Sequence, residues 1–199
     1  LRHIEPHEVE FEIKRFEAAV DKIWKHLESI KTKIDSQYRD PGHIIEAQQM
    51  MLKDEELKRS VISTIKEKQV NVEWALKSAL EKWEALFSGV DEDYLKERFS
   101  DIHHLISNLQ RHLSGDECLR FEPPPDAIVV VDEISAAETI QLGRSAVAAL
   151  ITQKGGRTSH TVIIAKAFEI PTIVGVKSIT TEVGTGDLIL IDGTEGVII

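Results

Sequence analysis

The sequence predicts an α+β protein in two parts, an antiparallel helical bundle followed by an α/β domain. Residues 1–117 contain only three of the 11 glycines and two of the six prolines, so turn-forming residues concentrate in the second part. Before residue 120 apolar residues recur every three or four positions, and after it short β-branched runs alternate with glycine-rich turns. Because three consecutive prolines at 123–125 cannot continue a helix, we predict domains at 1–120 and 121–199.

Four helices are expected in the first part. Apolar residues step by four and three from Val9 to Ile30, which predicts a long helix over about residues 7–35. The sequence Asp40-Pro41-Gly42 is expected to stop the chain's first helix. A second apolar stripe predicts one helix over residues 44–68.

The third and fourth helices are predicted from their capping residues. Asn71 can cap a helix that ends at Ser88-Gly89. Asp91 or Asp93 can cap the next helix, which runs to about residue 113 and is closed by Ser114-Gly115. Short connections between such helices favour antiparallel packing in a bundle.

Strands and helices alternate in the second part. Strands are expected at 127–131, 146–152, 172–176, 187–191 and 196–199, and helices at 135–142 and 161–168. The first of these helices opens with Ser135 and has Glu138 three residues later, which is a capping box. This alternation predicts an α/β or mixed three-layer domain.

Composition narrows the classes of partner and cofactor. Asp and Glu number 34 against 24 Lys and Arg, a formal charge of −10, which argues against nucleic acid or an anionic membrane as partner. A single cysteine, Cys118, excludes an internal disulfide, and with no long apolar run we expect a cytoplasmic protein. The histidines lack zinc-ligand spacing, so no metal or other cofactor is expected. The chain starts at Leu1 without an initiator Met, and we expect it to be part of a longer protein.

The candidate site is the segment between the strand at 146–152 and the helix at 161–168. Two glycines permit a tight turn that brings backbone N–H groups close to a ligand, and a helix N-terminus favours an anion such as phosphate. An arginine adds a charged fork that matches phosphate oxygens, and two hydroxyls add donors. The predicted phosphate-binding residues are Gly155, Gly156, Arg157, Thr158 and Ser159.

His160 is the candidate catalytic residue. It lies in the first helical turn, where the helix dipole disfavours imidazolium, so a neutral ring is available as a nucleophile toward phosphorus. The residues alone leave a plainer alternative, in which Gly-Gly is only a turn, the hydroxyls only cap the helix, and His160 is a surface histidine. Neither a P-loop nor a Gly-x-Ser-x-Gly elbow is present.

Residues 155–166, followed by Ile170-Pro171-Thr172-Ile173-Val174-Gly175, closely resemble the phosphohistidine signature of the phosphoenolpyruvate-utilising enzymes. In that family the matched histidine is phosphorylated at the ring nitrogen remote from the backbone. The resemblance therefore implies that His160 carries the phosphoryl group.

The helical part resembles enzyme I of the sugar phosphotransferase system, through residues 50–57 and 91–98, and the segment 135–142 resembles it too. This resemblance implies an HPr-binding helical subdomain beside a swivelling β/α phosphohistidine domain. It also implies that Thr139 orients His160. The HPr contacts that it implies are Ile45, Gln48, Met51, Glu55, Glu56, Tyr94, Arg98 and Asp101.

Two parts of enzyme I have no counterpart in this sequence, an N-terminal strand and the C-terminal barrel that binds phosphoenolpyruvate and magnesium. The implied function is a relay of phosphate from that C-terminal domain through His160 to the histidine of HPr, and the chain is not expected to use phosphoenolpyruvate alone. Two alternatives are the enzyme I-like portion of a multidomain dihydroxyacetone kinase phosphodonor and a non-catalytic HPr-binding module.

Overall fold

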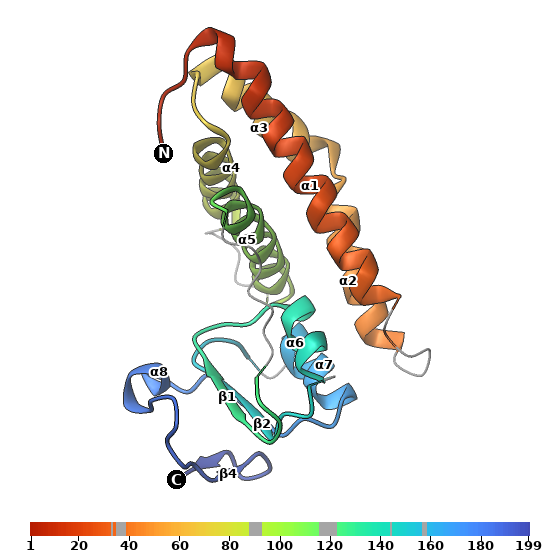
Figure 1. The fold of residues 1–199 in the computed structure, drawn as a ribbon, viewed down its shortest axis with the longest axis vertical. Helices are drawn as coiled ribbons and strands as arrows, with labels where there is room; N and C mark the ends of the chain where they lie inside the picture. Colours follow the sequence, from red (N-terminus) through yellow and green to blue (C-terminus); the bar gives the residue numbers. More distant parts are fainter. Residues whose placement is uncertain (33, 35–38, 88–92, 116–122, 144, 157–158) are drawn as a thin grey trace. The chain divides into compact units, whose positions relative to one another are not determined.

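The structure, a computed structural model, describes residues 1–32, 34, 39–87, 93–115, 123–143, 145–156 and 159–199 (Figure 1). The helices are α1 (Val9–Lys31), α2 (Arg39–Leu52), α3 (Glu55–Lys68), α4 (Val72–Phe87), α5 (Asp93–Leu113), α6 (Ala136–Gly143), α7 (His160–Ala167) and α8 (Ile179–Glu182), with a 3-10 turn at Pro6–Glu8. The strands are β1 (Ile128–Val131), β2 (Ala149–Thr152), β3 (Thr172–Val174), β4 (Ile191–Asp192) and β5 (Val197–Ile198). Long helices in the first part and a parallel sheet with helices in the second confirm the predicted fold class.

The chain divides into two compact units. The helical unit contains residues 1–29 and 46–119, and the α/β unit contains residues 30–45 and 120–199. The end of α1 and the start of α2 thus group with the α/β unit, a detail absent from the predicted division at residue 120.

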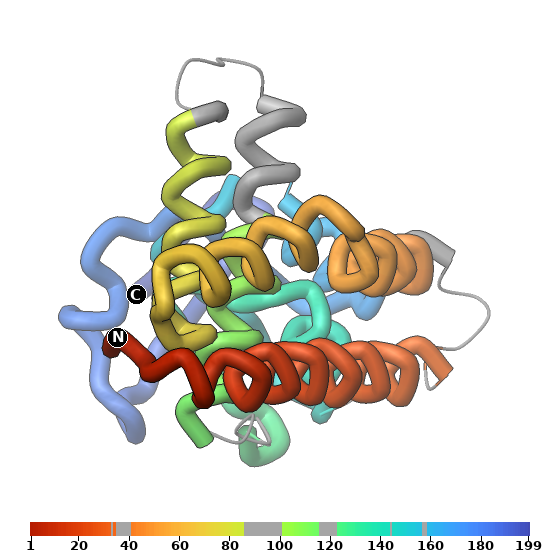
Figure 2. The backbone as a smooth tube through the Cα atoms, turned by 90° about the horizontal axis from the view of Figure 1, so that it is seen from above, coloured from red at the N-terminus to blue at the C-terminus, as the bar shows by residue number. Residues whose placement is uncertain are grey.

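Within the helical unit, α1 lies alongside α3, and α4 packs against both α3 and α5 (Figures 1 and 2). The apolar stripe of α1 is buried as its spacing predicts, with Ile13, Phe16, Ile23 and Leu27 each at most 6% exposed. Gly115, at φ +79°, follows the end of α5 in the left-handed conformation expected of a glycine after a helix.

The predicted single helix over residues 44–68 is wrong, because the chain breaks between α2 and α3. Asp54 has an extended backbone, and its carboxylate accepts hydrogen bonds from the N–H groups of Glu56 and Leu57 at 2.8 and 3.0 Å. These bonds satisfy donors that a new helix leaves unpaired, so Asp54 begins α3 rather than continuing α2. Across the break the buried apolar residues Leu52 and Leu57 are five positions apart, a step that does not fit a continuous helical stripe.

The sequence Asp40-Pro41-Gly42 was expected to stop a helix, and it instead lies in the first turn of α2. Proline is tolerated there because the first N–H groups of a helix have no intrahelical acceptor. These three residues therefore lie at the start of a helix rather than at the end of one, since α2 begins at Arg39.

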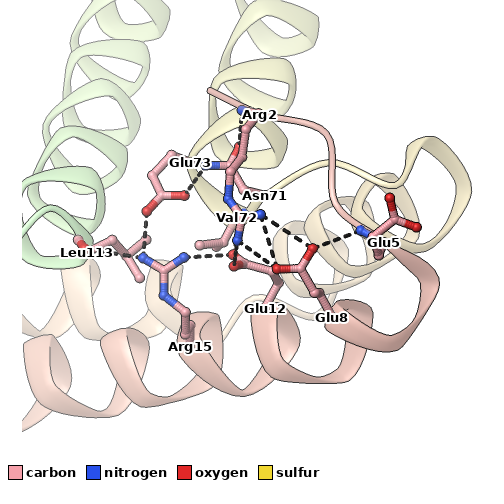
Figure 3. Close-up of polar contacts among 9 residues, drawn as sticks. All are labelled: Arg2, Glu5, Glu8, Glu12, Arg15, Asn71, Val72, Glu73 and Leu113. Atoms are coloured by element: carbon pink, nitrogen blue, oxygen red, sulfur yellow. Dashed lines mark hydrogen bonds and ion pairs between the residues drawn. The ribbon is translucent and has the colours of Figure 1, made fainter.

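The start of α4 is held differently from the prediction (Figure 3). The side chain of Asn71 does not cap α4; its Oδ1 accepts from the backbone N–H of Arg2 at 3.1 Å. The N–H of Val72 instead donates to Oε2 of Glu12, at 3.0 Å, from α1. For the next helix, Asp93 is the first residue of α5 rather than its cap, and the other predicted boundary residues, Ser88-Gly89 and Asp91, lie outside the described residues.

Glu12 is the centre of a polar network that ties α1 to α4 and α5 (Figure 3). Its side chain is fully buried, and Oε2 also accepts from Arg15 at 2.7 Å. Arg15 reaches Glu73 at 2.7 Å and the carbonyl oxygen of Leu113 at 3.3 Å. Burial disfavours the charge of Arg15, but the hydrogen bond and attraction from Glu73, together with Glu12, leave its pKa above the ordinary value.

The α/β unit is built on a three-stranded parallel sheet in the order β1-β2-β3. Val131 is opposite Thr152 in β2, and Thr152 is in turn opposite Val174 in β3. All four residues of β2 are buried, and α6 and α7, which connect the strands, pack against each other. One cluster of buried apolar side chains from the sheet, its helices and its connections contains Val129, Ile134, Leu142, Leu150, Ala165 and Ile170.

The remaining elements are short. The predicted strands at 187–191 and 196–199 are reduced to β4 and β5, which form an antiparallel pair through Ile191 opposite Ile198. The four-residue helix α8 was not predicted from the sequence. It starts after Ser178, whose φ of +62° lies in the left-handed region.

Candidate functional site

The glycine segment leaves the carboxyl end of β2, the central strand. Because the three strands are parallel, the carboxyl ends of β1 and β3 lie at the same edge of the sheet. In open α/β sheets ligands bind outside the carboxyl ends of the strands, at a point where the strand order reverses. The described strands follow the order β1-β2-β3 without such a reversal, so the predicted site shares the edge but not the reversal.

Gly155 is required by the backbone conformation of the turn. Its φ of +102° is rarely adopted by residues with a side chain. The turn is also fixed by Thr152, whose hydroxyl donates to the carbonyl oxygen of Lys154 at 2.6 Å. Gly156 differs, because a Cβ there would meet nothing within 4 Å. Among the residues that the structure describes, none fills the space beside Gly156, as the approach of a ligand to the backbone requires.

Ser159 caps the helix that carries His160. Its backbone is extended and its Oγ accepts from the N–H of Val162 at 3.4 Å. The hydroxyl proton of Ser159 is not used in that bond, so the side chain can cap α7 and still donate to an anion. The other two predicted phosphate-binding side chains, Arg157 and Thr158, lie outside the described residues.

His160 is the first residue of α7 and is half-buried. The unsatisfied N–H groups of a helix N-terminus favour a neutral ring and a nearby anion. A neutral imidazole has one nitrogen with a free electron pair, which is the atom that a phosphoryl group needs.

Thr139 is fully buried on α6, the helix that packs against α7. Its Oγ1 donates to the carbonyl oxygen of Ser135 at 2.8 Å. The proton of this hydroxyl is therefore committed, and the oxygen retains lone pairs that can accept from an N–H group. The preceding capping box is present as predicted, since the Ser135 N–H donates to Glu138 at 2.9 Å and the Glu138 N–H to Ser135 Oγ at 3.2 Å.

Both ends of the segment 155–160 are tied to the connection between β1 and α6, residues 132–135. Before the segment, the N–H of Lys154 donates to the carbonyl oxygen of Asp132 at 2.8 Å. After it, the hydroxyl of Thr161 donates to the carbonyl oxygen of Ile134 at 3.1 Å. The position of His160 is thus coupled to this connection at two points.

Sequence reasoning missed one charged group at this edge. The ammonium of Lys154 lies 2.8 Å from Oδ2 of Asp132 and 3.8 Å from Oε2 of Glu133. The hydrogen bond and attraction from Asp132, with Glu133, raise the pKa of Lys154 above its ordinary value. The sequence does show two carboxylates directly after a strand. That they meet Lys154 could be predicted only by knowing which residues of β1 and β2 are opposite each other.

The predicted HPr contacts differ in exposure. Glu55 and Glu56 are exposed and Met51 is half-buried. The expectation that Ile45 offers an exposed apolar contact is wrong, because its side chain is 0% exposed. Ile45 shares the buried face of α2 with Gln48 and Leu52, three and seven positions on.

The other predicted contacts lie on α5. Asp101 is buried at 8% exposure, and the side chains of Tyr94 and Arg98 lie outside the described residues. On α2 the exposed methionine is Met50, at 75%, rather than the predicted Met51.

A groove of about 540 Å³ lies between α1 and the break that separates α2 from α3. Phe16 and Leu52 supply apolar lining, and Lys53, Glu55 and Lys58 supply charge. Elsewhere, no group of three or more His, Cys, Asp or Glu among the described residues could hold a metal ion. None of the helices in the described ranges has the length and apolar character needed to cross a membrane.

Two family descriptions match the chain, one for each part. Residues 1–98 match "PEP-utilising enzyme, N-terminal", and residues 123–196 match "PEP-utilising enzyme, mobile domain". The second match contains the glycine turn and His160. Both parts of the chain thus match the family of phosphoenolpyruvate-utilising enzymes, as the motif predicted.

Curated relatives and solved structures indicate which member of this family the chain resembles. Phosphoenolpyruvate-protein phosphotransferases of Bacillus sp. (strain S) and Geobacillus stearothermophilus are each 34% identical over 197 residues, which is 96% of this chain and 34% of theirs. An NMR structure of enzyme I (nEIt) is 30% identical, with a TM-score of 0.77 over 100% of this chain and 81% of that one. The chain belongs to the enzyme I family, and it spans about a third of the length of the curated relatives it matches.

A second solved structure supports the fold alone. The N-terminal domain of Enzyme 1 - Nitrogen has a TM-score of 0.65 and 23% identity, over 100% of this chain and 82% of that one. Helical and α/β units are therefore shared by the two structures, at an identity too low to transfer a function.

Proposed function

We propose that this chain is the phosphoryl-transfer portion of an enzyme I, and that His160 carries the phosphoryl group between phosphoenolpyruvate and the phosphocarrier protein HPr. The observation that carries the proposal is the position of His160. It opens α7 directly after the glycine turn, at the carboxyl edge of a parallel sheet, in a segment that matches the mobile domain of the family. The proposed location is the cytoplasm, in keeping with the single cysteine.

The proposed chemistry is two in-line displacements at phosphorus. In the first, the electron pair on Nε2 of neutral His160 forms an N–P bond, the P–O bond of phosphoenolpyruvate breaks, and the enolate of pyruvate leaves with that electron pair. In the second, an imidazole nitrogen of HPr forms a new N–P bond, and the electron pair of the old bond returns to Nε2. Positioning and charge contribute most of the catalysis in such reactions.

Residues of this chain would bind the phosphoryl oxygens and orient His160. Backbone N–H groups at Gly155 and Gly156, the Ser159 hydroxyl, and the side chains of Arg157 and Thr158 would bind the phosphoryl oxygens. Thr139 would accept a hydrogen bond from the Nδ1–H of His160, which fixes the tautomer in which Nε2 is unprotonated. No metal or other cofactor is proposed for this portion. A C-terminal domain of the longer protein would bind phosphoenolpyruvate with its magnesium.

HPr would dock on the helical unit around the α2–α3 break. The exposed carboxylates of Glu55 and Glu56 would attract a basic partner, and Met51 would supply adaptable apolar contact. Tyr94 and Arg98 on α5 remain in the proposed surface. Gln48 and Asp101 are buried, so their part would be to hold neighbouring side chains in place.

The test is phosphoryl transfer from HPr that is already phosphorylated. We expect the wild-type chain to gain one acid-labile phosphoryl group, measured by intact-protein mass spectrometry at mildly alkaline pH, and His160→Ala to gain none. His43→Ala, at an exposed histidine of α2, is the matched control and should be labelled like the wild type.

An unlabelled wild-type chain that nevertheless forms a tight complex with HPr would contradict the proposal. Such a result would make the chain a non-catalytic HPr-binding module. Labelling that persists in His160→Ala would place the phosphoryl group on another residue and would also contradict it.

A further inference from the structure

Lys154 is the last residue before the glycine turn, and its side chain binds back to the β1–α6 connection. Its ammonium is 2.8 Å from Asp132 and 3.8 Å from Glu133. Gln153 reinforces the contact, because its amide nitrogen donates to Oδ1 of Asp132 at 2.9 Å and its amide oxygen accepts from Thr180 at 3.0 Å. These polar groups form one cluster at the carboxyl edge of the sheet.

The two carboxylates would work against a phosphoryl group at this edge. Asp132 and Glu133 belong to the connection that is bonded to both ends of the segment 155–160. Like charges repel, and the repulsion between charges near a protein surface exceeds that in bulk water. Two uncompensated carboxylates on this connection would therefore oppose a phosphoryl group that arrives with two negative charges.

Among the described side chains, Lys154 supplies the cation with the shortest contact to this pair. At 59% exposure its contribution to folding is expected to be small, because exposed ion pairs are worth about 0–1 kcal/mol. What distinguishes this ion pair is its place, on the residue that precedes the glycine turn and on the connection bonded to both ends of the segment 155–160.

We infer that Lys154 is a positioning residue for phosphoryl transfer, which neutralises Asp132 and Glu133 and holds the start of the glycine turn against the β1–α6 connection. This inference rests on the proposed function of His160. Lys154 need not touch the phosphoryl group; it acts through the two carboxylates and through the turn that it anchors.

The experiment measures the single-turnover rate of transfer from phosphorylated HPr at low and high salt. We expect Lys154→Met to slow transfer about tenfold at low salt, because it removes the positive charge that compensates Asp132 and Glu133. Lys154→Arg should keep the wild-type rate. Lys166→Met is the control, because this exposed lysine lies in the last turn of the same helix that begins at His160.

Two further readouts separate a charge effect from a structural one. Adding Asp132→Asn and Glu133→Gln to Lys154→Met should restore most of the lost rate, since no carboxylate then remains to be neutralised. High salt should also raise the rate of Lys154→Met more than that of the wild type, because salt screens repulsion between exposed charges.

Three results would overturn the inference. They are a Lys154→Met rate within twofold of the wild type, an equal loss in Lys166→Met, and a loss that the added Asn and Gln substitutions do not restore. If Lys154→Met fails to fold, two other variants are compared with the wild type. They are Lys154→Arg, and the double variant Asp132→Asn with Glu133→Gln that keeps Lys154. Each must transfer at no less than the wild-type rate. A wild-type chain that gains no phosphoryl group refutes the proposed function instead, so the two failures are distinguishable.

Discussion

Glu12 caps a helix that begins 60 residues later, because its buried carboxylate accepts the backbone N–H of Val72 at 3.0 Å. The same oxygen binds Arg15, and Arg2 lies 3.6 Å from the other oxygen, which accepts no hydrogen bond. One side chain thus holds α1, the N-terminal segment and the start of α4 together (Figure 3).

Replacing Glu12 should destabilise the helical unit strongly. We expect Glu12→Ala to lower the free energy of unfolding by about 3 kcal/mol, because it leaves the buried N–H of Val72 without its acceptor and removes one of the acceptors of the Arg15 guanidinium. The measurement is urea unfolding followed by tryptophan fluorescence, since Trp24, Trp74 and Trp83 all belong to the helical unit. Glu10→Ala, at an exposed position of α1, should change stability by less than about 0.5 kcal/mol. Equal effects of the two substitutions would contradict the role given to Glu12.

The two glycines of the turn should respond differently to alanine. Gly155→Ala places a side chain at φ +102° and should cost at least about 1–2 kcal/mol, seen as a lower Tm of the α/β unit in calorimetry. Gly156→Ala meets nothing within 4 Å and should leave the Tm nearly unchanged. If the proposed phosphate contact is correct, Gly156→Ala should nevertheless slow phosphoryl transfer, because the added methyl group occupies the open space beside the backbone. Transfer at the wild-type rate in Gly156→Ala would argue against that contact.

Thr139 should affect transfer without affecting the fold. Thr139→Val removes the hydroxyl, but the carbonyl oxygen of Ser135 keeps its helical hydrogen bond from the Thr139 N–H at 2.9 Å. We expect transfer to slow about tenfold, with an unchanged KM for phosphorylated HPr and an unchanged Tm, because the ring of His160 would lose the proposed acceptor that fixes its tautomer. Thr139→Ser should retain most of the rate. A rate loss in Thr139→Ser as large as that in Thr139→Val would show that the methyl group, and not the hydroxyl, is what matters.

The contacts of Glu8 with the N-terminal segment should be lost in acid while the helical unit stays folded. The backbone N–H of Glu5 and the guanidinium of Arg2 hold the pKa of Glu8 below its ordinary value of 4.5. The ionised form is therefore the one that the fold favours. Its contribution is complete above the ordinary value and is lost as the pH falls through the lowered one.

The amide NMR signal of Glu5 should report this loss, because its N–H donates to Glu8 at 2.8 Å. Glu8→Gln should remove most of the acid-induced shift of that signal, and Glu10→Gln should leave it in place. An unchanged titration in Glu8→Gln would assign the transition to another carboxyl group.

Local patterns predicted the parts of the fold that depend on neighbours in sequence. The capping box of Ser135 with Glu138, the left-handed Gly115 and the helix after the glycine turn all follow from residues within a few positions of one another. The family was predicted for the same reason, since its signature is a continuous segment that includes His160.

Contacts between distant segments could not be predicted in this way. That Glu12 caps α4, and that Lys154 meets Asp132, depends on how helices pack and on which residues of β1 and β2 are opposite each other. The burial of Ile45 follows from where α2 begins, six residues earlier than Ile45, and the sequence suggested a stop in that region. The break at Asp54 did have local signals, a capping residue and a five-residue step between Leu52 and Leu57, but the prediction extended one apolar stripe across it.

The central position of β2 in the sheet has a consequence for hydrogen exchange next to the candidate site. Its backbone is bonded to a strand on each side and its four residues are buried, so its amide protons should exchange with deuterium more slowly than those of the flanking strands. The glycine turn begins at Gly155, three residues beyond the end of this strand. The proposed phosphoryl carrier, His160, therefore follows the strand of this sheet whose backbone is expected to open least often.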